Sequence, residues 1–188
     1  MKRGIFITVR SDSTRLPRKC YRNLGDVSTI EFLIDRVKHS KFSDVIVLCT
    51  TTRSIDDELC EIAEKNDIKF YRGSYEDKLE RWNGACKEFG IDFFVTADGD
   101  DLFCDPHLID TAFEQAEDPK IDFIKCDGVI WGAFTYGIRS TALEKVCSIK
   151  DTTDTEMMWV YFTDTGLFEV RQLHPVDKKF MRTDIRMT

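Results

Sequence analysis

Two short segments of the sequence concentrate residue types that can bind phosphate and divalent metals. The first, RSDSTRLPRK at residues 10–19, follows the apolar run GIFITV at 4–9 and carries the cations Arg10, Arg15 and Lys19. A loop that leaves a buried strand and precedes a helix can offer backbone amides, hydroxyls and positive charge to a polyphosphate. On composition alone a solvated basic turn is an equally good interpretation. The segment also lacks both the P-loop and the GxGxxG patterns of other phosphate sites.

The second segment is DGDD at residues 98–101, directly after the apolar stretch FFVTA. Clustered carboxylates at the end of a strand are costly unless a positive group neutralises them, and Mg²⁺ bound to the phosphates of a nucleotide would do so. An isolated DGDD is more often a polar turn, because aspartate and glycine are common turn residues. The metal interpretation gains weight if the cationic loop lies at the same edge of the structure.

The hydrophobic pattern predicts strands that alternate with helices. Strands are expected at 4–9, 44–50, 68–73, 121–127 and 167–174, and the segment 92–101 is expected to be a strand that runs into the acidic loop. Helices are expected at 29–40, 54–66 with Ser54 as N-cap, 75–90 ending on Gly90, 106–118 and 140–149, with a further N-cap signal in 153–166. This alternation indicates an α/β protein with a mainly parallel sheet and helices on both faces. Sites in such sheets gather at the carboxyl ends of the strands, so the basic and acidic segments are expected to meet in space.

The composition bounds the class of protein. A chain of 188 residues is expected to form a single domain, and its net charge of -7 with a pI near 5.1 argues against binding to nucleic acid or to a membrane surface. No signal peptide and no run of about 18 apolar residues is present, so a cytoplasmic location is expected. The seven cysteines are scattered without metal-ligand spacing, and none is assigned a catalytic role.

Two blocks of this sequence resemble a known enzyme family. The block ITVRSDSTRLPRKCYRNLG (7–25) is similar to the N-terminal signature of the cytidylyltransferases that activate acidic sugars, roughly A-R-x-x-S-T-R-L-P-x-K. The block YRGSYEDKLERWNGACKEFGIDFFVTADGDDLFCDP (71–106) resembles a later one, with "RGS…D-x-L-x-R" and "GD…DP". The branch with spore-coat polysaccharide proteins and CMP-Kdo synthetases is the most similar. The resemblance covers residues 4 to about 118 and implies the Rossmann-like nucleotide-diphospho-sugar transferase fold.

The resemblance also implies an activity, which is the transfer of CMP from CTP to a small anionic acceptor with release of pyrophosphate and with Mg²⁺ as cofactor. The residues expected to contact the nucleotide are Arg10, Ser11, Ser13, Thr14, Arg15 and Lys19. Asp100 matches the loop carboxylate that holds Mg²⁺, and Asp98 is the neighbouring candidate. Arg15, Lys19 and Asp100 are therefore the expected catalytic residues. Nucleotidyl transfer needs charge neutralisation and in-line attack but no covalent protein nucleophile.

The sequence departs from the family pattern at two places in the site. Arg18 stands where the family often has glycine before the loop lysine. The arginine adds a cation and is expected to leave less room for the loop backbone to approach the nucleotide. Asp101 and Leu102 replace the usual proline and its small neighbour. Asp101 could be an extra metal ligand or a solvated loop residue, and the second interpretation is preferred.

The second part of the chain, residues 119–188, is expected to bind the acceptor and to form a homodimer interface, whereas residues 1–118 bind nucleotide and metal. GVIWGAFTYGIRS (128–140) interleaves glycines with aromatic residues, and this pattern supplies Tyr136 and Arg139 as acceptor candidates. Glu156 is a weaker candidate. Aromatic residues at strand spacing are more often part of the core, so that alternative stays open.

Two further alternatives stay open. The enzyme could transfer a nucleotide other than CMP, since the base-reading residues are not identifiable, or the fold could be a non-catalytic nucleotide-binding module. In the resembled family, a sequence like the final RMT leads into a strand with a second metal-binding aspartate. That position would lie beyond Thr188, so the chain is expected to be a truncated or partial protein that is deficient in metal-dependent transfer.

Overall fold

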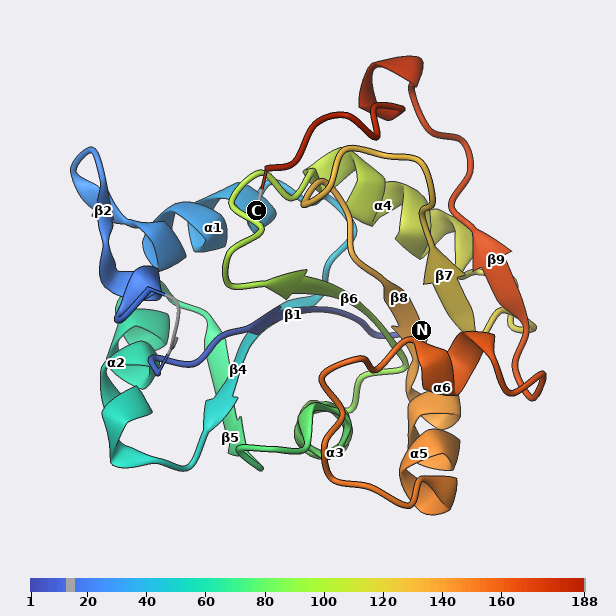
Figure 1. Cartoon of the computed structure of the whole chain (residues 1–188), viewed down its shortest axis with the longest axis horizontal. Helices are drawn as coiled ribbons and strands as arrows, with labels where there is room; N and C mark the ends of the chain where they lie inside the picture. The colour runs from blue at the N-terminus through green and yellow to red at the C-terminus, as the bar shows by residue number, and fades with distance from the viewer. Residues whose placement is uncertain (13–15, 188) are drawn as a thin grey trace.

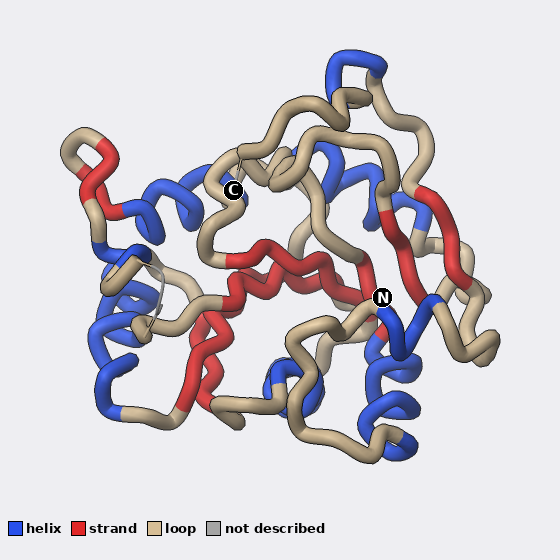
Figure 2. The backbone as a smooth tube through the Cα atoms, in the orientation of Figure 1, coloured by secondary structure: helices blue, strands red, loops and turns tan. Residues whose placement is uncertain are grey.

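A mixed, mainly parallel sheet forms the centre of the molecule in the computed structural model, which describes residues 1–12 and 16–187. Within these residues the sheet has seven strands in the order β5-β4-β1-β6-β8-β7-β9. Figure 2 shows the strands in red and the helices around them in blue. The strands of the sheet are β1 (Arg3–Thr8), β4 (Val45–Thr51), β5 (Lys69–Gly73), β6 (Phe93–Asp98), β7 (Phe123–Lys125), β8 (Gly137–Arg139) and β9 (Val170–Gln172). The strands from β5 to β6 run parallel, and β8 is antiparallel to both β6 and β7. The predicted α/β class is therefore confirmed.

Helices cover both faces of the sheet, as the alternation of elements predicts. They are α1 (Thr29–Val37), α2 (Asp57–Lys65), α3 (Lys78–Phe89), α4 (Pro106–Gln115), α5 (Ser140–Ile149) and the short α6 (Val160–Thr163). Figure 1 shows α1 and α4 on one side of the central strands and α3 and α5 on the other. Successive β1 side chains point to opposite faces, so Ile5 and Ile7 join the core under α1, α2 and α4, whereas Phe6 joins the core under α3, α5 and α6.

Side-chain caps set the helix boundaries that matter for the site. The α3 helix begins at Lys78 because the Asp77 carboxylate accepts a hydrogen bond from the Glu80 amide at 3.0 Å. It ends before Gly90, which has a φ of 64° as a left-handed C-cap, in agreement with the prediction. The expected Ser54 cap is wrong. Residues Ser54–Asp56 form a 3-10 turn before α2, and the Asp56 carboxylate binds other partners instead of capping the helix.

The described structure differs from the sequence expectation in three further segments, one of which is the strand β8, which the hydrophobic pattern did not predict. In 153–166 only Val160–Thr163 is α-helical, and the N-cap signal there does not begin a long helix. A small hairpin of β2 (Asn23–Leu24) and β3 (Val27–Ser28), turning at Gly25, was not predicted from the sequence. Two-residue strands are too short to give a periodic pattern. No described helix has the length and apolar character needed to cross a membrane.

The C-terminal segment folds back toward the acidic loop. The Met187 amide donates to the Trp131 carbonyl at 2.8 Å, and Trp131 and Arg186 form a parallel bridge. In Figure 1 the end of the chain accordingly lies close to the loop after β6. Asp184 forms an ion pair at the surface, in which both of its carboxylate oxygens accept from the Arg182 guanidinium at 2.7 Å.

A buried polar network joins the N-terminus of α3 to the loop after α5. The Asp77 carboxylate accepts hydrogen bonds from the Lys150 ammonium and, at 3.2 Å, from the Thr155 hydroxyl. Thr155 in turn accepts from the Leu79 amide at 3.2 Å and is fully buried. The side chains of Lys150 and Asp77 are only 9% and 6% exposed, so this pair is a buried ion pair rather than a surface one.

The substitution Lys150→Met is expected to lower the free energy of unfolding by about 3 kcal/mol, because it leaves the Asp77 carboxylate buried without its cation. Urea denaturation measures this change. Lys87→Met is the matched control, since Lys87 forms an exposed pair with Glu144 and its removal should cost less than about 1 kcal/mol. Equal losses of unfolding free energy in the two variants would show that the buried pair stabilises the protein no more than the exposed pair does.

Candidate active site

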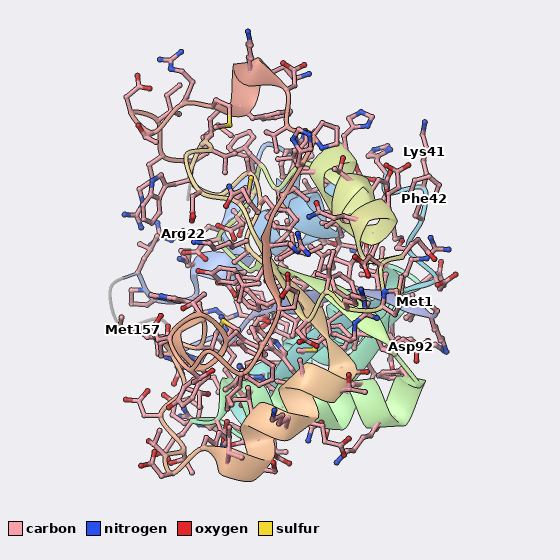
Figure 3. All side chains as sticks on the ribbon, turned by 90° about the vertical axis from the view of Figure 1, so that its right-hand side faces the viewer. Met1, Arg22, Lys41, Phe42, Asp92 and Met157 are labelled. Carbon is pink, nitrogen blue, oxygen red and sulfur yellow. The ribbon has the colours of Figure 1, made fainter. Side chains whose placement is uncertain are left out.

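An open cavity of about 240 Å³ lies at the carboxyl-terminal edge of the parallel strands. Its walls come from the end of β1 with the basic loop, the N-terminus of α3, the DGDD loop after β6, and Glu156. Four of the residues labelled in Figure 3 show the two opposite sides of the molecule. Arg22 and Met157, which follow the basic loop and Glu156, lie on one side of the molecule, and Met1 and Asp92 lie on the other.

The basic and acidic loops meet at this cavity, as predicted from their places after two parallel strands. The Lys19 ammonium lies 2.6 Å from the Asp100 carboxylate. The backbones are also joined, because the Gly99 amide donates to the Thr8 carbonyl at 2.8 Å. A Cβ at position 99 would lie only 2.8 Å from the Val9 side chain, so glycine permits this close approach.

A second cation of the cavity pairs with the acidic loop from a different element, the helix α3. The Lys78 ammonium, at the first residue of α3, lies 2.8 Å from the Asp98 carboxylate and 4.9 Å from the centre of the Trp82 ring. Sequence reasoning missed Lys78. The available signal was its position, since a helix that follows the parallel strand β5 begins at the same carboxyl-terminal edge.

Arg10 lines the cavity within a cluster that sequence reasoning did not anticipate. Its guanidinium lies 3.4 Å from Asp12 and 5.0 Å from the centre of the Tyr75 ring. Asp12 also accepts from Arg53 at 2.6 Å and from the Tyr75 hydroxyl at 2.7 Å. Burial acts to raise the pKa of Asp12, but the Tyr75 and Arg53 hydrogen bonds and the two arginine charges outweigh it and leave that pKa lowered. Asp12 is thus held as an anion that orients the cations.

The remaining residues of the basic loop have different outcomes. Ser11 is 2% exposed, its amide donates to Asp56 at 2.8 Å, and its hydroxyl hydrogen-bonds the Tyr21 hydroxyl at 2.7 Å, so it supports the loop rather than lining the cavity. The expectations for Ser13, Thr14 and Arg15 fall outside the described residues.

Arg18 does not add its charge to the cavity, contrary to the expectation. Its guanidinium pairs with Glu58 at 2.6 Å and lies over the Tyr21 ring at 4.3 Å. Its backbone has a φ of 54°, the left-handed conformation that glycine adopts at least cost. This geometry gives a physical reason for the glycine that the family pattern carries at this position.

Asp101 is a buried residue, and the preferred interpretation as a solvated one is wrong. It is 7% exposed, and its carboxylate accepts from the Thr135 hydroxyl at 2.9 Å and the Asp98 amide at 3.3 Å. Burial and the negative charges of Asp98 and Asp100 raise its pKa to about 6. Asp101 therefore holds the acidic loop in place through these two hydrogen bonds.

The three acceptor candidates lie in three different environments. Glu156 lines the cavity, as expected for a residue that contacts substrate. Tyr136 packs its ring near those of Phe123 and Trp159, at 5.1 and 6.2 Å between centres. Burial, followed by nearby carboxylates that include Asp98, raises the pKa of Tyr136 to about 12. The core alternative thus accounts for this ring.

Arg139 does not lie where the prediction puts it. It pairs with Phe93 at the start of β6, the opposite edge of the sheet from the cavity. There its guanidinium donates to the backbone carbonyls of Ala116, Asp118 and Ile121. A three-residue strand gave no signal for its direction, and that direction decides which edge Arg139 occupies.

The carboxylates of the cavity fit a hard cation that also binds a substrate. Among the described residues, no group of three or more histidine, cysteine, aspartate or glutamate side chains is arranged to hold a metal ion. Asp98 and Asp100 both line the cavity, and Mg²⁺ commonly binds through one or two carboxylates together with substrate phosphates. Cys20 also lines the cavity, but burial raises its pKa to about 11, which disfavours the reactive thiolate.

The substitution Asp101→Asn is expected to stabilise the protein at neutral pH but not in acid. The folded-state pKa of about 6 exceeds the ordinary value of 3.8, so the folded state holds a proton that the unfolded state releases. Stability is therefore lost as the pH rises from about 4 through 6, and the uncharged variant should gain about 2 kcal/mol at pH 7.5 but little at pH 4. Urea denaturation at both pH values, with exposed Asp26→Asn as control, measures the gain. A gain that does not change with pH would contradict the explanation.

Comparison with known proteins agrees with this geometry. The cytidylyltransferase family matches residues 5–179. A solved cytidylyltransferase from Leptospira borgpetersenii serovar Hardjo-bovis is 30% identical, with a TM-score of 0.88 over 99% of this chain and 80% of that one.

Two curated proteins are also similar. An uncharacterized protein of Methanocaldococcus jannaschii is 30% identical over 185 residues, which cover 97% of this chain and 76% of that protein. The spore coat polysaccharide biosynthesis protein SpsF of Bacillus subtilis is 31% identical over 122 residues, 63% of this chain and 51% of SpsF. A family match of this extent, over a fold that brings the basic and acidic loops to one cavity, shows that the chain belongs to the cytidylyltransferase family.

Proposed function

We propose that the protein transfers CMP from CTP to a small anionic acceptor, an acidic sugar, with release of pyrophosphate and with Mg²⁺ as cofactor. The observation that carries the proposal is the pair of lysine–carboxylate contacts, Lys19 with Asp100 and Lys78 with Asp98, across one cavity. A cavity with cations and carboxylates on facing walls suits a polyphosphate that arrives with a divalent metal. The family match supports cytidine as the nucleoside.

The cations and the carboxylates of the cavity would have different roles, the cations binding phosphate and the carboxylates binding metal. Lys19, Lys78 and Arg10 would turn their donors to the phosphates, and Lys19 would neutralise the charge that develops on the leaving pyrophosphate. Asp98 and Asp100 would then hold Mg²⁺, which when bound supplies charge neutralisation on the phosphate oxygens. Binding of the metal–nucleotide complex therefore exchanges two internal ion pairs for contacts with the ligand.

The acceptor would approach from the wall that carries Glu156. Its oxygen attacks the α-phosphate, the bond from this phosphorus to the oxygen bridging to the β-phosphate breaks, and pyrophosphate leaves. Where the attacking group is a hydroxyl, the Glu156 carboxylate, which lines the cavity, would accept its proton. No covalent intermediate with the protein is needed.

A nucleotide titration combined with an acceptor screen tests this function. Affinity for CTP above that for UTP, ATP and GTP, and pyrophosphate release with one of a panel of acidic sugars, would support it. Preference for another nucleotide would replace CMP transfer by transfer of that nucleotide. Tight nucleotide binding without pyrophosphate release for any acceptor would favour a non-catalytic module.

A homodimer is also part of the proposal. The second half of the chain carries exposed large apolar side chains, among them Trp131 and Met157, each 60% exposed, and Met157 is labelled at the surface in Figure 3. Exposed apolar surface of this kind is typical of association sites when it is contiguous. Sedimentation of the purified protein gives its oligomeric state directly.

The substitution Lys19→Ala is expected to raise the Kd for CTP about tenfold or more and to reduce turnover, because it removes a phosphate partner from the cavity. Stability should change little, since the residue is partly exposed and its loss leaves no core cavity. Calorimetric titration measures the affinity, and exposed Arg22→Ala is the control. Unchanged CTP affinity in Lys19→Ala would count against the phosphate role of the loop.

The substitution Asp100→Asn is expected to retain the fold but to abolish the gain in CTP affinity that Mg²⁺ provides, because the amide keeps the shape and removes the charge. The measurement is CTP titration with and without Mg²⁺, with Asp26→Asn as the control. A variant that gains as much affinity from Mg²⁺ as the parent protein does would place the metal elsewhere.

A further inference from the structure

Arg81 is a buried cation at the cavity without a described counterion. The residue lines the cavity yet is only 4% exposed. One guanidinium nitrogen, Nη1, donates to the Ser74 carbonyl at 2.7 Å, and the buried Nε has no hydrogen-bond partner. A buried donor without an acceptor costs free energy, and a buried charge without a partner costs more.

The position of Arg81 is fixed by its surroundings. It lies one turn after Lys78 on α3, so both side chains project from the same helix face toward the cavity. Its stem packs against the end of β5, where a Cβ at Gly73 would come within 2.9 Å of the Arg81 Cγ atom. Glycine at position 73 thus makes room for the arginine. The guanidinium is held in place by packing rather than by an ion pair.

The other described cations of the cavity contrast with Arg81. Lys19, Lys78 and Arg10 each have a carboxylate partner within 3.4 Å. Arg81 instead has no ion pair among the described residues. Burial, with the positive charge of Arg10, lowers the pKa of Arg81, although Cys49 and the Asp56 and Asp98 carboxylates act in the opposite direction. A purely structural role would be served without a charge, since the Ser74 carbonyl needs only one donor.

We propose that Arg81 is a further substrate-binding residue whose guanidinium receives a phosphate oxyanion of the bound nucleoside triphosphate from the floor of the cavity. Guanidinium groups bind phosphate oxygens through paired hydrogen bonds, and Arg81 has donors left for this purpose. The neighbouring Arg10 makes the same position favourable for an anion of high charge. The inference rests on the proposed function in that the substrate is a nucleoside triphosphate.

The test compares ligand affinity and stability in Arg81→Met and Arg81→Lys, with Lys87→Met on the exposed face of α3 as the control. Calorimetric titrations use CTP with Mg²⁺, inorganic pyrophosphate with Mg²⁺, and cytidine. Arg81→Met should weaken CTP and pyrophosphate at least tenfold and leave cytidine unchanged, and Arg81→Lys should recover part of the loss because it retains the charge. Without ligand, Arg81→Met should unfold at a temperature no lower than the parent protein, because it removes an isolated buried charge.

Two outcomes would overturn the assignment. Unchanged affinity for both CTP and pyrophosphate in Arg81→Met would show that the guanidinium does not meet the phosphates, which leaves the acceptor's anionic group as its ligand. A lower unfolding temperature without ligand, with all three ligands weakened alike, would show a structural role. If the parent protein binds pyrophosphate but shows no preference for CTP, the proposed cytidine specificity fails while the pyrophosphate titrations still decide the role of Arg81.

Discussion

The compensation of charge at one edge of the sheet is the constraint on which the site depends. Strand β6 ends in carboxylates that would repel one another, and cations from two other elements are brought to them. Lys19 comes from the loop after β1 and Lys78 from the first turn of α3. Parallel strands make this convergence possible, because loops far apart in sequence leave the sheet at the same edge. The same pairs join the two loops at the cavity and are the contacts that a metal–nucleotide complex would exchange.

Buried polar groups behind the cavity fix the elements that carry its side chains. Asp101 is buried beneath the acidic loop and binds the Thr135 hydroxyl and the Asp98 amide. Asp77, Lys150 and Thr155 tie the first turn of α3 to the loop that ends in Glu156. These buried side chains hold the walls of the cavity in position, although none of them lines the cavity itself. In the Asp77 cluster the desolvation cost is offset by the Lys150 ammonium and the Thr155 hydroxyl. At Asp101 the hydrogen bonds offset it only in part, so the pKa of that carboxyl stays raised.

The sequence predicted the architecture well because the elements with strong periodicity are also the ones that build the sheet. The apolar runs of β1, β4 and β6 and the stripes of α1 and α4 correspond to the two buried cores. The meeting of Lys19 with Asp100 followed from the same topology. The failures have local causes. The burial of Asp101 and the direction of Arg139 depend on short, non-periodic segments after residue 100 whose tertiary neighbours leave no pattern in the sequence. Lys78 and Arg81 were missed because the helix at 75–90 was predicted only by its bounds, and no role was assigned to the side chains of its first turn.

A crystal structure of this protein with CTP and Mg²⁺ tests the central claim most directly, because the claim concerns where the triphosphate and the metal lie. The account predicts the triphosphate in the cavity beside Arg10 and Lys19, with Mg²⁺ between its oxygens and the carboxylates of Asp98 and Asp100, and with the Lys19–Asp100 pair opened. A nucleotide bound elsewhere, or a triphosphate in the cavity with both lysine–carboxylate pairs intact and the metal remote from the DGDD loop, would contradict the account.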